Sequence, residues 1–142
     1  MEERLGVIFN EKDLLKTART HDSYLNEPSG KGQESYERLE FLGDAVLRLV
    51  VSERLYLEVK GNEGELSRQR DELVKRESCN KAARKLGLWQ RLLLSESERK
   101  RPPNPRILAE AYEAVIGAIY LDQGYESAGQ FVNRTLESRS GT

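Results

Sequence analysis

Two long segments of this chain repeat apolar residues at the spacing of an α-helix. In the first, from about residue 34 to residue 59, apolar side chains recur every few positions, at Leu39, Leu42, Val46, Val50 and Leu57. The second segment, residues 107–122, is more apolar still. This spacing gathers apolar side chains on one face of a helix. No stretch shows the apolar–polar alternation of a half-buried strand, so the sequence predicts an all-α fold, a helical bundle.

Shorter helices are expected around these two. We expect one that begins near residues 10–13, one over residues 65–86 that breaks at about residues 77–78, and two more over residues 89–94 and 126–136. Gly61, Gly87 and Gly124 mark helix ends, and Pro105 suits a helix start. With 142 residues and no repeat or interdomain linker, the chain is predicted to form about one domain.

The net charge of −1 conceals an uneven distribution. Residues 68–106 contain twelve basic and five acidic residues, a net +7, whereas the remainder contains eleven basic and nineteen acidic residues, a net −8. A basic segment of this kind is either a binding surface for a polyanion or a solvated helical surface with ordinary charge mixing. The candidate residues for binding a polyanion are Arg68, Arg70, Lys75, Arg99, Lys100 and Arg101.

Several classes of protein are excluded by what the sequence lacks. The longest apolar run, residues 114–121, is far shorter than the roughly 20 residues that span a bilayer, and residues 1–4 do not resemble a secretory signal. We therefore expect no membrane association and a cytoplasmic location. The single cysteine, Cys79, and the single histidine, His21, cannot build a disulfide, a thiolate cage or a multi-histidine metal site. We interpret Cys79 as a packing residue and His21 as a capping or packing residue.

Both apolar helices also carry acidic residues in pairs. Glu37, Glu40 and Asp44 are three and four positions apart and share one face of the first helix. Glu110 and Glu113 are three positions apart in the second helix. Because an unpaired buried charge is costly, acids on helices this apolar need a partner or a metal ion.

Two interpretations of these acids remain open at this point. Two helices that each offer an acidic pair can build an oxygen-only cage for Mg²⁺, and two such ions stabilise the attacking and leaving oxygens in phosphodiester cleavage. Alternatively, the acids face solvent or form ion pairs with Arg38, Arg48 and Arg106. A di-iron bundle is excluded, because it needs two Glu-x-x-His motifs and the chain has one histidine.

Residues 37–47 read Glu-Arg-Leu-Glu-Phe-Leu-Gly-Asp-Ala-Val-Leu. This string resembles the signature motif of the ribonuclease III family. Further segments resemble the family in the same order along the chain: residues 5–9, 20–24, 26–27, 64–67, 85–88, 107–114 and 117–122. The resemblance therefore covers nearly the whole chain.

This resemblance implies an all-α endonuclease domain, residues 1–142, that forms a homodimer and hydrolyses double-stranded RNA. It implies Mg²⁺, with Mn²⁺ as a substitute, and no small-molecule cofactor. The catalytic and metal-binding residues that it implies are Glu40, Asp44, Glu110 and Glu113. Glu37 and Glu65 would support this site, and Phe41 would insert into a pocket of the partner subunit. The products would carry 5′-phosphate and 3′-hydroxyl ends with a short 3′ overhang, as in the processing of ribosomal, messenger or small RNA precursors.

The chain departs from the family pattern at two places. Glu110 stands where the family usually has Asp, and the extra methylene moves the carboxylate by about 1.5 Å. Residues 95–98 replace a stretch that usually contains glycine. No double-stranded RNA-binding domain, which many members append, is expected in this chain. Two alternative functions are a non-catalytic RNA-binding or ribosome-associated protein of this fold and a nucleotide pyrophosphohydrolase, which the string at residues 37–47 disfavours.

Overall fold

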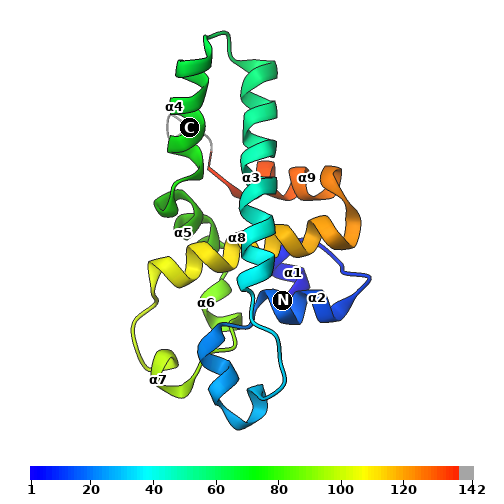
Figure 1. The fold of residues 1–142 in the computed structure, drawn as a ribbon, viewed down its shortest axis with the longest axis vertical. Coiled ribbons are helices and arrows are strands. Elements are labelled where there is room, and N and C mark those ends of the chain that lie inside the picture. The colour runs from blue at the N-terminus through cyan, green and yellow to red at the C-terminus, as the bar shows by residue number, and fades with distance from the viewer. Residues whose placement is uncertain (138–142) are drawn as a thin grey trace.

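Helices dominate the computed structural model, which describes residues 1–137 (Figure 1). In chain order they are α1 (Glu2–Leu5), α2 (Lys12–Ala18), the 3₁₀ helices η1 (Asp22–Asn26) and η2 (Pro28–Gly30), α3 (Glu37–Glu58), α4 (Glu63–Val74), α5 (Arg76–Lys85), α6 (Leu88–Arg91), α7 (Glu96–Arg99), α8 (Pro105–Gln123) and α9 (Tyr125–Thr135). Within residues 1–137 there is no strand, only an isolated bridge between Thr20 and Leu93. The predicted all-α fold is confirmed. None of the described helices is long and apolar enough to cross a membrane.

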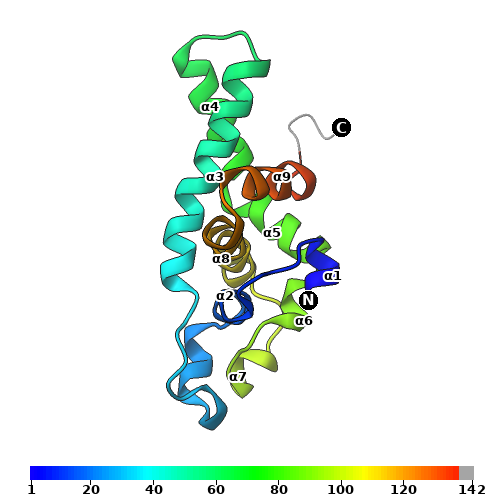
Figure 2. The same ribbon diagram turned by 90° about the vertical axis from the view of Figure 1, so that its right-hand side faces the viewer.

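The two longest helices, α3 and α8, cross in backbone contact and form the most extensive helix pair (Figures 1 and 2). Both correspond to the segments predicted from apolar spacing. A Cβ atom on Gly43 of α3 would lie 1.6 Å from the carbonyl oxygen of Glu113, and one on Gly117 of α8 would lie 2.3 Å from that of Leu39. Only a hydrogen atom fits in either place, so the two glycines allow the helices to approach this closely.

Helices α3 and α4 form an antiparallel hairpin that projects from the rest of the molecule, at the top of Figure 1. The side chain of Asn62 caps α4 by accepting the backbone N–H of Glu65 at 3.0 Å. The predicted break between α4 and α5 lies at Lys75, not at residues 77–78. Lys75 has extended dihedrals, φ −65° and ψ 161°, through which no helix continues. Ser78 lies inside α5 and donates its hydroxyl to the carbonyl of Glu72.

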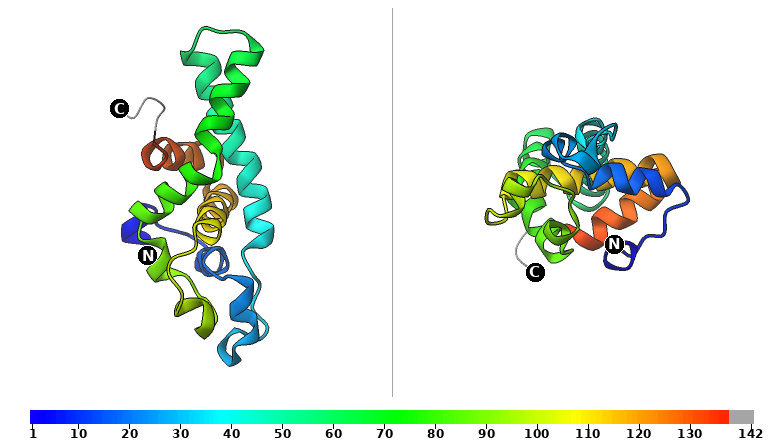
Figure 3. Two further views of the ribbon diagram at one scale, coloured as in Figure 1. Left: turned by 90° about the vertical axis from the view of Figure 1, so that its left-hand side faces the viewer. Right: turned by 90° about the horizontal axis from the view of Figure 1, so that it is seen from below.

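Helix α8 runs through the centre of the core, enclosed by α2, α3, α5 and α9 (Figure 3). It begins at Pro105, as predicted, and the Asn104 side chain caps its first backbone N–H groups. Two short elements differ from the sequence prediction. Helix α6 ends at Arg91 rather than near residue 94, and residues 95–98 begin α7, which is capped by the Ser95 hydroxyl.

The lone histidine and the lone cysteine have the structural roles that the sequence suggested. The His21 ring accepts the backbone N–H of Ser23 at 3.1 Å and so caps η1. The thiol of Cys79 is buried in the core, against the carbonyl of Val74. Burial raises the pKa of the Cys79 thiol to about 12, so the group stays protonated and acts as a small packing residue.

Replacing Gly43 or Gly117 by alanine is expected to push α3 and α8 apart. Each added methyl group would meet the backbone of the opposite helix, which cannot turn aside as the end of a side chain can. We expect each variant to lose about 3 kcal/mol or more of unfolding free energy, the upper end of the cost of overpacking. Urea denaturation followed by circular dichroism would measure the loss.

Gly129→Ala is the matched control for these two variants. Gly129 also lies within a helix, but a Cβ atom there would meet only a methyl group of Val50 at an ordinary 3.9 Å. Alanine favours a helix over glycine by up to about 1 kcal/mol, so this variant should be neutral or slightly more stable. Equal destabilisation by all three substitutions would contradict the special role of the crossing.

Candidate active site of clustered acids

Four acidic side chains meet in one cavity between α3, α5 and α8. Glu40 and Asp44 come from α3, and Glu110 and Glu113 come from α8. The cavity measures about 230 Å³, and all four side chains are half-buried. Its other lining residues are Arg48, Val74, Lys75, Arg76, Cys79, Arg106 and Ala109. The structure therefore brings together all four acids that the sequence singled out as a group.

The crossing of α3 and α8 explains why these acids are neighbours. Gly43, which touches the backbone of Glu113, lies between Glu40 and Asp44 in the sequence. Residues three or four apart on a helix share a face, so both acids of each helix stand beside the point of contact. Glycine at the crossing thus sets the separation of the two acidic pairs.

The acids raise one another's pKa. Burial, a hydrogen bond with Asp44 and the negative charges of Asp44 and Glu40 raise the pKa of Glu113 to about 8 from its ordinary 4.5. Burial and the charges of Glu110 and Glu37 raise the pKa of Glu40 to about 7. Both effects favour the protonated form over the charged one. A cluster of this kind takes up protons when no cation is present and can exchange them for a cation.

Two of the acids also have arginine partners one helical turn away. Arg48 donates to Asp44 at 3.3 Å, and Arg106 donates to Glu110 at 3.0 Å. The ion-pair interpretation is therefore confirmed for these two arginines. The third candidate, Arg38, pairs instead with Glu34, at 4.0 Å. The acids are thus both gathered together and partly neutralised.

The donor set fits a hard divalent cation, which prefers carboxylate oxygens and retains water. Within residues 1–137, however, no three acidic, histidine or cysteine side chains already converge closely enough to hold an ion. Two of the carboxylates, Asp44 and Glu110, pair with arginines one turn along their own helices. Since all four acids line the cavity and are partly exposed, rotamer changes can bring their carboxylates closer together.

Tyr36 belongs to this region and was missed by the sequence reasoning. Its hydroxyl donates to Oε1 of Glu110 at 2.8 Å, across 74 residues of sequence. The side chain is only 1% exposed. Burial, the charge of Glu110 and this hydrogen bond strongly raise the pKa of Tyr36, which keeps the hydroxyl protonated as a donor. No sequence signal marks the pair, because a residue before a helix has no local relation to one in another helix.

The two predicted supporting acids lie outside the cavity. Glu37 is exposed and lines an adjacent cavity of about 300 Å³, which it shares with Glu110 and Arg106. Glu65 is exposed at the start of α4, in the projecting hairpin, and is not among the lining residues of the acidic cavity. The structure of one chain therefore places Glu37 beside the site and Glu65 away from it.

The six basic candidates have different environments. Lys75 is at the acidic cavity, and Arg68 and Arg101 are exposed. Arg70 is half-buried near Ser52 and Asp71, and Lys100 pairs with Glu96 at 3.1 Å.

Arg99 is engaged in holding the fold together. Its guanidinium donates to the carbonyls of Trp89 and Leu92 and lies 5.5 Å from the centre of the Trp89 ring. Partial burial lowers the pKa of Arg99. These contacts join α6 to α7, so the prediction that Arg99 binds RNA is not supported. Arg76, which the sequence reasoning left out, lies at the acidic cavity instead.

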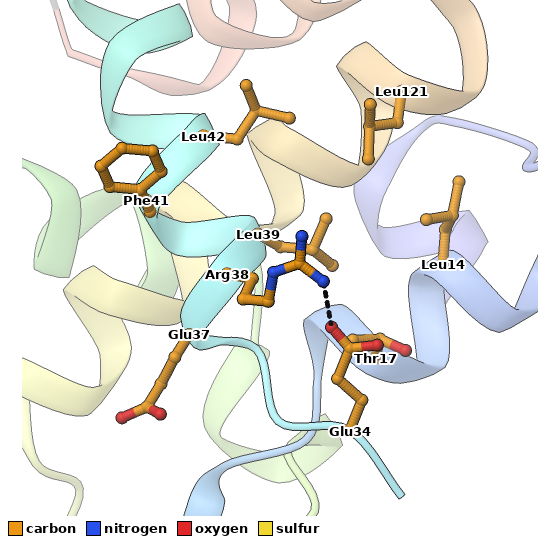
Figure 4. Close-up of a pocket in the computed structure, with 9 residues that line it drawn as sticks. All are labelled: Leu14, Thr17, Glu34, Glu37, Arg38, Leu39, Phe41, Leu42 and Leu121. Carbon is orange, nitrogen blue, oxygen red and sulfur yellow. Dashed lines mark ion pairs between the residues drawn. The ribbon is translucent and has the colours of Figure 1, made fainter.

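Phe41 projects from the first turns of α3 and is 83% exposed (Figure 4). It borders a groove of about 670 Å³ whose lining combines four leucines with polar and charged side chains. The apolar lining residues are Leu14, Leu39, Leu42 and Leu121. Figure 4 shows the ion pair of Arg38 with Glu34 at the edge of this groove. An exposed aromatic residue beside an apolar groove is typical of a protein–protein contact.

Comparison with known proteins relates the chain to named relatives. It is 45% identical over 136 residues to Ribonuclease 3 of Oceanobacillus iheyensis, an alignment that covers 94% of this chain and 60% of the relative. It is 46% identical over 142 residues to Ribonuclease 3 of Oleidesulfovibrio alaskensis, with 98% and 62% covered. The chain thus spans about three fifths of the length of these curated relatives.

Solved structures and a family model point to the same family as these relatives. The nuclease domain of ribonuclease III from Campylobacter jejuni, whose description mentions dimer formation, superposes with a TM-score of 0.84 at 41% identity, covering 94% of this chain and 92% of that one. A second structure of that domain gives a TM-score of 0.78. The family model described as Ribonuclease-III-like matches residues 11–139. The chain therefore belongs to the ribonuclease-III-like family.

Proposed function

We propose that this chain is the nuclease domain of an endoribonuclease that cuts double-stranded RNA with divalent cations, Mg²⁺ in the first place. The observation that carries the proposal is the gathering of Glu40, Asp44, Glu110 and Glu113 in one cavity. Membership of the ribonuclease-III-like family and identity to proteins named Ribonuclease 3 support it. Each cut would leave 5′-phosphate and 3′-hydroxyl ends, and two staggered cuts would leave a short 3′ overhang.

The four acids are the residues that would hold the cations. When bound, the cations supply positive charge to the attacking and leaving oxygens of the phosphodiester. The chain's own contribution begins with proton release, because Glu113 and Glu40 have raised pKa values and ligating carboxylates must be ionised. Arg48 and Arg106 must also give up part of their contact with Asp44 and Glu110.

Basic residues around the cavity provide a surface for the RNA backbone. Arg48, Lys75, Arg76 and Arg106 line the same cavity as the acids. Phosphate contacts of this kind position a nucleic acid without reading its sequence, which suits recognition of a duplex by shape. Arg68 and Arg101 are exposed on α4 and just after α7, two elements that lie on the same side of Figure 1 as α5.

The proposed active form is a homodimer assembled through α3. Phe41 is a large apolar side chain with 83% of its surface exposed, and burying it would be favourable by roughly 2 kcal/mol. The neighbouring groove offers apolar walls of a suitable size. In this arrangement Phe41 of one protomer would occupy the groove of its partner.

Cleavage of a long RNA duplex tests the proposed activity. With Mg²⁺ or Mn²⁺ we expect short products with 5′-phosphate ends, and with a chelator none. Glu113→Gln should reduce the rate by more than about 100-fold while RNA still binds, because an amide keeps the volume but removes a metal-binding charge. Gel electrophoresis and a filter-binding assay would measure both properties.

Glu126→Gln is the control for this variant, because it makes the same change at an exposed glutamate of α9. It should cleave like the wild type. Salt-dependent RNA binding by a folded dimer without cleavage in either metal would overturn the proposal and favour a non-catalytic RNA-binding protein.

Stability without metal is expected to fall as the pH rises. The pKa values of Glu40 and Glu113 are raised to about 7 and about 8, so the folded state binds protons more tightly than the unfolded state does. Their stabilising contribution is complete below the ordinary pKa of 4.5 and is lost as the pH passes through the folded values. In a chelating buffer, the melting temperature should therefore decrease between about pH 5 and pH 8.

Two comparisons test whether this pH effect comes from Glu113 and the proposed metal site. Glu113→Gln should flatten the decrease, because the amide does not titrate. Mg²⁺ should raise the melting temperature more at the high end of this pH range than at the low end, since it binds the ionised carboxylates. An identical pH profile for the variant and the wild type would contradict the assignment to Glu113.

Phe41→Ala is expected to shift the dimer towards monomer. The substitution removes the ring that the partner's groove would bury, so the dimer dissociation constant should rise by at least about tenfold. Sedimentation velocity over a concentration series would measure it. Ile8→Ala is the control, because Ile8 is 78% exposed but lies in the loop between α1 and α2. If both variants associate like the wild type, Phe41 is not a dimer contact.

A further inference from the structure

The hydroxyl of Tyr36 makes the one hydrogen bond that the described structure shows between a fully buried side chain and an acid of the cavity. Tyr36 lies just before α3, whereas its acceptor, Glu110, is in the second turn of α8. The hydroxyl is directed at Oε1 of Glu110 at 2.8 Å. A tyrosine hydroxyl that is buried usually has such a partner. Here that partner is an acid of the proposed metal site.

The tyrosine ring is held in place on several sides. The backbone N–H of Tyr36 donates to the carbonyl of Thr20 at 2.8 Å. The ring meets His21 edge-on, with ring centres 5.8 Å apart. The backbone carbonyl of Tyr36 accepts the N–H of Glu40 at 2.8 Å, which joins Tyr36 to the first turn of α3. The hydroxyl therefore has a defined position relative to both helices.

The other partner of Glu110 is of a different kind. The Arg106 side chain is 68% exposed and binds Oε2 at 3.0 Å as a pair four residues apart on one helix. Exposed pairs of this type are weak, and the guanidinium can turn into solvent. Tyr36 is buried and cannot leave in this way. When a cation enters the cavity, Arg106 is the partner that can give way, and Tyr36 is the partner that stays.

We propose that Tyr36 is a positioning residue, whose hydroxyl orients the carboxylate of Glu110 so that its remaining lone pairs are available to a divalent cation. This proposal rests on the metal-binding function proposed above and extends it. A carboxylate accepts hydrogen bonds at both oxygens and still has lone pairs to ligate a metal. Groups that orient a metal ligand raise the affinity of the site, because the ligand loses less freedom on binding.

Tyr36→Phe tests this role, because it removes the hydroxyl and keeps the ring in the core. We expect the affinity for Mn²⁺ to fall by about tenfold, measured by calorimetric titration of the protein without RNA. The Mg²⁺ concentration that gives half-maximal cleavage should rise in parallel, with a smaller change in the rate at saturating Mg²⁺. A merely structural role would lower the folded fraction and leave this concentration unchanged.

Tyr112→Phe is the matched control. Tyr112 is also fully buried, but its hydroxyl lies 2.7 Å from that of Thr135 in α9 and is not hydrogen-bonded to an acid of the cavity within the described residues. Both substitutions remove one buried hydroxyl, so both should lower the melting temperature by a few degrees. Only Tyr36→Phe should change the affinity for Mn²⁺. Equal affinities for the two variants would overturn the proposal.

A double-mutant cycle identifies the residue through which Tyr36 acts. In a Glu110→Ala background the hydroxyl has no carboxylate to orient, so Tyr36→Phe should have no further effect on the Mn²⁺ affinity. A full tenfold effect in that background would show that Tyr36 does not act through Glu110. If the wild type binds no Mn²⁺, the proposed metal site and this inference fail together. If Glu110→Ala weakens binding but Tyr36→Phe does not, only this inference fails.

Discussion

The backbone contact between α3 and α8 is the constraint on which the rest of the structure depends. Helices that cross with side chains between them are usually 8–10 Å apart, whereas Gly43 and Gly117 have no side chains to separate them. The crossing lies at the centre of the core, and other helices pack around α8. It also sets the positions of the acidic pairs of the two helices relative to each other. Stability and the candidate site therefore depend on the same two residues.

In the acidic cavity, repulsion between the carboxylates is offset by protonation and by arginine partners. Burial and neighbouring negative charges raise the pKa values of Glu40 and Glu113, while arginines one turn away compensate the charges of Asp44 and Glu110. The raised pKa values and the arginine partners thus offset the negative charge that cations would offset in the proposed function. An arrangement of this kind keeps an acidic cluster within a folded domain and leaves it ready for exchange, because each compensating group is mobile or titratable.

Local periodicity explains which parts of the structure could be predicted. The spacing of apolar residues predicted α3 and α8, and the three- and four-residue spacing of the acids predicted that each pair shares a face. The break at Lys75 could not be predicted in the same way, since a lysine carries no signal for an extended backbone. The structural contacts of Arg99 could not be predicted for a related reason. Its positive charge suggested RNA binding, but the carbonyls and the indole that it contacts come from another helix.

The sequence by itself determined the all-α class, the two central helices and the pairing of acids on each helix, because these follow from relations between residues a few positions apart. Only the tertiary structure decided that the two acidic pairs share one cavity, that Tyr36 contacts Glu110 and that Glu65 does not line the acidic cavity of its own chain. These facts depend on how closely and at what point α3 and α8 cross. The crossing is set by contacts between residues about 74 positions apart, which no local pattern encodes.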